Sequence, residues 1–114
     1  MLVTTPPAVK AVRSVLRDMG VDAGTRWVND GYVWVEVAGG ESLAVWIEGN
    51  EHGDVVHIAE QLQNDLSETS TFWGRALPGC PGHTHPASPE RGDDEPWWVC
   101  PVSGARVARI GELA

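Results

Sequence analysis

The residues of this chain that are best suited to chemistry lie between Cys80 and Gly104. Both cysteines of the sequence and two of its four histidines fall in this window, in the short segments 80–85 and 100–104. Thiolate and imidazole are the usual ligands of structural zinc, and a Cys-x2-His step lets one tight turn present two of them to one ion. Proline and glycine shortly after each cysteine are typical of such turns. The window therefore predicts two zinc knuckles, of which the second lacks one ligand.

A tetrahedral site needs four ligands, and the two segments offer a candidate for each. His83 stands where a zinc ribbon has its second thiolate, and Ser103 stands where it has its fourth. Serine is a poor zinc ligand because its hydroxyl must ionise, whereas His85 offers a neutral nitrogen donor. We therefore predict a closed site formed by Cys80, His83, His85 and Cys100. The alternative is a metal-free loop with two buried thiols.

The same window gives little support to catalysis. A hydrolytic zinc site keeps one open position and places a carboxylate nearby as general base. The acids of this loop are typical of a solvated segment, and they are Glu90, Asp93, Asp94 and Glu95. The chain has no Gly-rich phosphate loop, no Gly-x-Ser-x-Gly and no His-Glu-x-x-His. A thiolate–imidazole pair of Cys80 and His83 is conceivable, but further ligand-type residues beside them favour metal, so we predict no catalytic residue.

The end of the chain carries a resemblance. Cys-Pro-x-His…His-Pro, then Trp-x-Cys-Pro, then the segment 107–113, resembles the C-terminal signature of small uncharacterised proteins common in actinobacteria. The resemblance covers about the last third of the chain. It implies a degenerate zinc-ribbon-like C-terminal part and no particular activity.

Charge and hydropathy narrow the functional classes. At 114 residues the chain has the length of one domain, and its net charge is −8. Residues 1–26 carry four basic against two acidic side chains, whereas residues 27–114 carry four against fourteen. An acidic body repels phosphate backbones, so nucleic-acid binding is unfavourable. Without an apolar run of membrane-spanning length or a signal-like start, we expect a cytoplasmic location, where a Cys80–Cys100 disulfide is not expected.

The elements that must position these residues form an α+β pattern of helix, three antiparallel strands, helix, loop and hairpin. The first helix opens at Pro6-Pro7 with Thr5 as its cap and ends at Gly20. Its apolar stripe consists of Val9, Val12, Leu16 and Met19. The second helix spans about 54–69, with Gln61 on its polar side and an apolar stripe of Val55, Ile58, Ala59, Leu62 and Leu66.

The rest of the chain is predicted to depend on the metal. The loop over 77–96 is long for a connection inside a compact domain, so either something holds it or it is disordered, and a metal at its two ends would meet that requirement. A closing hairpin follows, formed by residues 97–100 and 105–110. We expect a single domain, with a core over 1–76 and a zinc-knuckle-like loop and hairpin over 77–114 packed on it.

Three strands over 26–48 set the position of an aromatic row. Asp30-Gly31 predicts a two-residue turn that pairs Trp27 with Trp34. A three-residue loop over 39–41 then pairs Trp34 with Trp46. This register places Trp27, Trp34 and Trp46 on one face of the sheet and the valines on the other. We predict that the row is covered, either by the C-terminal hairpin or by a second chain.

The interpretation that best fits these patterns is a non-catalytic protein-interaction or adaptor module with a structural zinc ion. Its partner is a protein or a second copy, and no membrane contact is expected. One alternative is a metal-free assembly or chaperone-like dimer, because the order of elements is similar to that of type III secretion chaperones. The other is a small zinc hydrolase or a nucleic-acid-associated zinc module.

Overall fold

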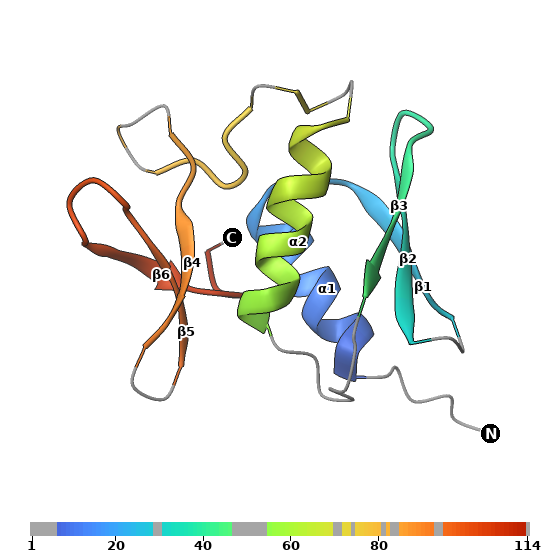
Figure 1. The fold of residues 1–114 in the computed structure, drawn as a ribbon, viewed down its shortest axis with the longest axis horizontal. Helices are drawn as coiled ribbons and strands as arrows, with labels where there is room; N and C mark the ends of the chain where they lie inside the picture. The colour runs from blue at the N-terminus through green and yellow to red at the C-terminus, as the bar shows by residue number, and fades with distance from the viewer. Residues whose placement is uncertain are drawn as a thin grey trace.

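Two helices lie between two three-stranded antiparallel sheets (Figure 1). The computed structural model describes residues 7–28, 31–46, 55–69, 72–73, 75–80, 82, 85–92 and 95–113. The sheets have the orders β1-β2-β3 and β4-β5-β6. The predicted α+β class and the helix–sheet–helix order are confirmed. In chain order the elements are α1 (Pro7–Asp18), β1 (Ala23–Val28), β2 (Tyr32–Val37), β3 (Ser42–Trp46), α2 (Val55–Ser67), β4 (Ser88–Arg91), β5 (Pro96–Val99) and β6 (Arg106–Arg109).

Helix α1 forms and ends as its sequence predicts. The end is a Schellman motif, in which the N–H groups of Val21 and Gly20 donate to the carbonyls of Leu16 and Arg17, each at 3.0 Å. Gly20 takes the left-handed conformation, with φ of +70°. Thr5 and Pro6, the predicted start, lie outside the described residues. All four members of the predicted stripe are buried: Val9, Val12, Leu16 and Met19.

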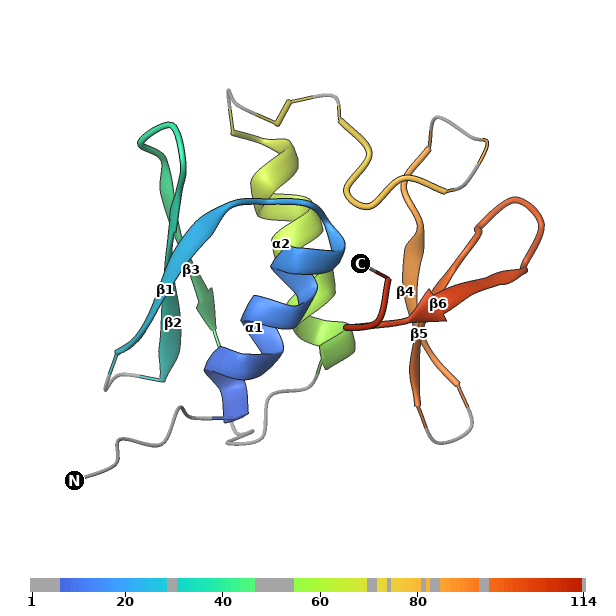
Figure 2. The ribbon, with the colours of Figure 1, turned by 180° about the vertical axis from the view of Figure 1, so that it is seen from behind.

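Helix α2 completes the middle layer, which the two sheets cover from opposite sides (Figure 2). Four of the five predicted stripe residues are buried, and Val55 is only partly buried, whereas its neighbour Val56 is buried. The helices form the interior layer, because their apolar stripes are buried between the two sheets. Within the described residues, neither helix is long and apolar enough to cross a bilayer.

The first sheet has the predicted strands but a different register. Trp27 pairs with Val33, one residue away from its predicted partner Trp34. The connecting loop therefore has three residues, and the N–H of Gly31 donates to the carbonyl of Val28 at 3.0 Å. Gly31 has φ of +91°, and a left-handed glycine in third position is typical of three-residue hairpin loops. The predicted two-residue turn is wrong: Gly31 is the third residue of a three-residue loop, not the second residue of a two-residue turn.

The second hairpin loop is also displaced. The N–H of Val37 donates to the carbonyl of Glu41 at 2.8 Å, so the loop residues are 38–40 rather than 39–41. Trp46 consequently pairs with Tyr32 rather than with Trp34. The partner changes by two positions, which leaves every side chain on its predicted face of β2 and β3. The buried face is aliphatic and includes the fully buried Val33, Val35 and Val45.

The C-terminal part contains more structure than predicted. The hairpin of β5 and β6 is confirmed, but the preceding segment also forms a strand, β4, which pairs with β5. Pro89 lies within β4, and a proline is tolerated there because β4 is an edge strand. Residues 77–96 are therefore not one long loop, because part of the segment forms a strand and contributes to the core. Buried residues of this segment include Leu77, Pro78, Ala87 and Pro89.

A buried carboxylate joins α1 to the C-terminal part. Asp18 is 7% exposed and accepts hydrogen bonds from Trp98 Nε1 at 2.8 Å, from the N–H of Leu113 at 3.1 Å and from the N–H of Gly111. A carboxylate at the C-terminal end of a helix is disfavoured by the helix dipole. The three N–H donors compensate for this position and for the burial.

Candidate metal centre

Cys80 and His85 lie opposite each other at the base of the first knuckle. The N–H of Cys80 donates to the carbonyl of His85 at 3.1 Å, and the N–H of Ala87 donates to the carbonyl of Pro78 at 2.8 Å. A bridge between Gly79 and Pro86 lies between these two pairs. This short antiparallel ladder positions both candidate ligands through the backbone alone.

Cys100 begins the second knuckle, directly after β5. Its N–H donates to the carbonyl of Ala105 and its carbonyl accepts from the N–H of Gly104, both at 2.8 Å. Gly104 has φ of +75°, which the tight reversal requires. The hydroxyl of Ser103 accepts the N–H of Ala105 at 3.2 Å, and Ser103 is exposed. The Ser103 side chain therefore stabilises the turn in which it lies.

Helix α2 and strand pairing bring the two knuckles together. The side-chain amide of Gln63 donates to the carbonyl of Leu77 at 3.0 Å and to that of Ala87 at 2.6 Å, which ties the first knuckle to α2. Ser88 pairs with Val99 in the neighbouring strand. Residues just before β4 and just after β5 consequently adjoin each other.

Three of the predicted ligands converge at this point. The sulfurs of Cys80 and Cys100 and a ring nitrogen of His85 all lie within 4.8 Å of one another. Both cysteines are 4% exposed and His85 is partly exposed. Two thiolates on a tetrahedral zinc ion lie about 3.8 Å apart, given Zn–S bonds of about 2.3 Å. The arrangement fits a metal ion after only small movements of the side chains. His83, the fourth predicted ligand, lies outside the described residues.

The thiol pair resists ionisation unless a cation lies beside it. Burial raises the pKa of the Cys80 thiol, and hydrogen bonding and charge interaction with Cys100 raise it further. Two neighbouring thiolates repel each other, so both ionise readily only when a cation lies between them. Among the described residues, the cluster contains no carboxylate. Glu95 instead forms an ion pair with Arg109 at 2.8 Å.

The predicted tryptophan row does not form. Register places Trp27 on the helix-facing side of the sheet, whereas Trp34 and Trp46 lie on the outer side. Trp46 is 48% exposed and lies 4.9 Å from Tyr32 between ring centroids. The described C-terminal hairpin packs beyond the helices, on the far side from this face (Figure 1), so the prediction that it covers the row is wrong. We use "aromatic outer face" for Tyr32, Trp34 and Trp46.

Two residues of structural importance escaped the sequence analysis. Gln61, predicted to be outward-facing, exchanges two hydrogen bonds with the backbone of Trp46, at 3.0 and 2.7 Å. Asp18 gave a signal, because an acid in the last turn of an otherwise basic helix face opposes the helix dipole. An amide such as Gln61 gives no such signal, since glutamine is equally common on solvated helix faces.

No protein-family model, curated protein or solved structure matches this chain. The resemblance to actinobacterial proteins therefore stays a prediction, and the functional argument depends on the geometry of the chain itself.

Proposed function

We propose that the protein is a non-catalytic interaction module whose C-terminal part is held by one structural zinc ion. The observation that carries the proposal is the convergence of Cys80, His85 and Cys100 from two separate knuckles within 4.8 Å. Two thiolates and an imidazole select zinc over magnesium or calcium, which prefer oxygen ligands. His83 is the proposed fourth ligand. Zinc bound there links the segment before β4 to the hairpin of β5 and β6.

A structural role is favoured over hydrolysis by the donor set. The described cluster offers no carboxylate that could serve as general base. Zinc binding requires Cys80 and Cys100 as thiols rather than as a disulfide, which is the state expected in a reducing cytoplasm. A cytoplasmic location is therefore part of the proposal.

The aromatic outer face supports the interaction role. Trp46 is 48% exposed, and its ring packs only on its own sheet, against Tyr32, among the described rings. Tryptophan and tyrosine are enriched at the centres of protein interfaces, because their rings bury much apolar area with little loss of entropy. In a sample of the purified protein alone, we propose that a second copy of the protein covers this face.

The zinc site predicts a specific loss of metal. Cys100→Ser is expected to release most of the zinc, because the hydroxyl must ionise to replace the thiolate. Elemental analysis of purified protein measures the stoichiometry. Limited proteolysis should show faster cleavage at the knuckle tips, whereas the helices should stay protected, since Gln63 and the β4–β5 pairing hold the base of the first knuckle without metal.

Two matched variants sharpen this test. His85→Ala should weaken zinc binding, whereas Ser103→Ala should keep full stoichiometry, because Ser103 is exposed and bonded within its turn. The reverse order would show that Ser103, rather than His85, is a zinc ligand. Wild-type protein that takes up no zinc and resists protease equally in chelator would contradict the proposal.

The aromatic outer face predicts self-association. Trp46→Ala is expected to weaken the dimer at least about tenfold, which corresponds to the loss of one interface hot spot. Stability of the monomer should change by less than about 1 kcal/mol, because half of the ring is already in water. Light scattering across a concentration series measures the mass. Trp73→Ala is the control, since Trp73 is 76% exposed and lies outside the sheets. A wild-type chain that stays monomeric throughout would refute the dimer.

A further inference from the structure

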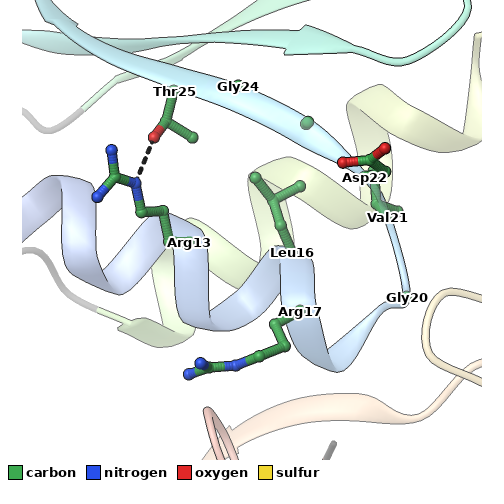
Figure 3. Close-up of a pocket in the computed structure, with 9 residues that line it drawn as sticks. Arg13, Leu16, Arg17, Gly20, Val21, Asp22, Gly24 and Thr25 are labelled. Atoms are coloured by element: carbon green, nitrogen blue, oxygen red, sulfur yellow. Dashed lines mark hydrogen bonds between the residues drawn. The ribbon is translucent and has the colours of Figure 1, made fainter.

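A groove runs between α1 and the strand that follows it (Figure 3). Its volume is about 480 Å³, and one wall is formed by residues 20–25. The other wall is formed by Arg13, Leu16 and Arg17, which are spaced as neighbours on one helix face. Residues 20–22 of this wall belong to the turn after α1 and residues 23–25 to β1, so the groove runs alongside the first half of the strand.

The groove follows an unpaired sheet edge. Among the described strands, β1 has β2 as its only neighbour. The carbonyl of Asp22 accepts the N–H of Ala38 at 3.0 Å, so Asp22 is directed towards β2. Backbone direction alternates in an antiparallel ladder, which turns Gly24 and Arg26 to β2 as well. The N–H and carbonyl groups of Ala23 and Thr25 therefore point to the open edge.

Side chains of α1 extend across this edge. The Arg13 Nε donates to the hydroxyl of Thr25 at 2.7 Å, which holds the guanidinium beside the strand (Figure 3). Leu16 is 3% exposed and forms an apolar floor between helix and strand. Arg17 leaves the next turn with its guanidinium directed away from the strand. A strand entering here would meet a cation, an apolar floor and free backbone groups.

The groove is a basic site on an acidic protein. Lys10, Arg13 and Arg17 are exposed on α1, and residues 1–26 carry four basic against two acidic side chains, whereas residues 27–114 carry four against fourteen. The guanidinium of Arg17 has no ion pair with the described residues. By contrast, Arg109 on the second sheet pairs with Glu95 at 2.8 Å. The exposed carboxylate of Asp22 lies at one end of the groove, so the charged lining residues Arg13, Arg17 and Asp22 leave a net charge of +1. Charge complementarity near Arg13 therefore favours an acidic ligand.

We propose that this groove binds an extended acidic segment of another protein, which adds a strand to the open edge of β1. Strand addition gives affinity through the backbone, and the side chains facing α1 give selectivity. Here selectivity comes from carboxylates that reach Arg13. A second copy is disfavoured, because pairing two β1 edges would bring the same arginines together. The site is separate from the zinc cluster and from the aromatic outer face, so it goes beyond the proposed function.

The test uses a fluorescent peptide of alternating valine and glutamate, about eight residues long, which is the length of a typical strand. Fluorescence anisotropy should show saturable binding to the full chain. Arg13→Gln should weaken it about tenfold, as expected for loss of one charge-assisted hydrogen bond. Thr25→Pro should abolish it, because proline removes an edge N–H that the β1–β2 ladder does not use. Thr25→Val, which removes only the hydroxyl that holds Arg13, should weaken binding no more than Arg13→Gln does. Arg75→Gln, which removes a charge outside the groove, should bind like wild type.

Each contrary result is informative. Equal binding of a valine–lysine peptide, or full affinity of a folded Thr25→Pro variant, would overturn strand addition. Binding of single-stranded oligonucleotide that depends on Arg13 would assign the groove to nucleic acid instead. Self-association that Thr25→Pro removes would assign the edge to a second copy. Zinc stoichiometry is measured on the same samples and should be unchanged in every variant, which separates this proposal from the metal site.

Discussion

Asp18→Ala is expected to destabilise the protein by about 3–5 kcal/mol, because three N–H donors lose a charged acceptor at once. The substitution leaves the indole N–H of Trp98 and the N–H groups of Gly111 and Leu113 without their acceptor. Each hydrogen bond to a charged group contributes about 1.5–3 kcal/mol, and a buried donor without a partner is costly. Urea unfolding monitored by circular dichroism measures the change in free energy.

A neighbouring acid provides the matched control. Asp22→Ala removes an exposed carboxylate four residues away in sequence and should change the free energy of unfolding by less than about 0.5 kcal/mol. Asp18→Asn keeps one carbonyl acceptor but adds N–H groups where three donors already converge, so it should lie near the alanine variant. Equal stability of Asp18→Ala and Asp22→Ala would show that the carboxylate does not join α1 to the C-terminal part.

Trp98→Ala should have an effect of similar size, about 3–5 kcal/mol, because it removes the largest of the fully buried side chains. Trp98→Phe should cost less, since it keeps an aromatic ring in the core and loses the hydrogen bond to Asp18. Thermal and urea unfolding of both variants measures these costs. Trp73→Ala, at a site that is 76% exposed, should be nearly neutral.

The two sites should also be coupled. In the double variant of Asp18→Ala and Trp98→Phe, the loss of stability should be smaller than the sum of the single losses, because both changes remove the same hydrogen bond. Strict additivity would show that the indole finds another acceptor. Loss of the C-terminal sheet alone, with α1 and the first sheet still folded, would show that the two sheets do not unfold together.

Periodicity in the sequence predicted the helices well. The stripe of α1 is buried as predicted because its spacing matches one helix face and Gly20 supplies the left-handed stop. The strands were found, but the register was not. Asn29-Asp30-Gly31 is compatible with a two-residue and with a three-residue loop, and the choice between them depends on packing against α1. The one additional loop residue places Trp27 on the opposite face of the sheet from Trp34.

The metal cluster was predicted in part. Residue type and spacing identified Cys80, His85 and Cys100, because few other patterns place ligand-type residues beside tight turns. The sequence did not reveal what brings the knuckles together. Strand β4 contains Pro89, which argues against a strand until an edge position is known, and Gln63 gives no local signal for its two long-range hydrogen bonds. Long-range contacts of this kind depend on the assembled fold.

The contact between Gln61 and Trp46 makes the first sheet asymmetric. The amide of Gln61 occupies the place of a neighbouring strand beside the last residue of β3, whereas the edge of β1 has no such partner among the described residues. Filament growth by edge pairing needs two receptive edges on each molecule, so that every added subunit offers a new end. A sheet blocked at one edge can accept a single guest strand, but it cannot propagate. Gln61 thus disfavours growth of the first sheet at the Trp46 end of its β3 edge.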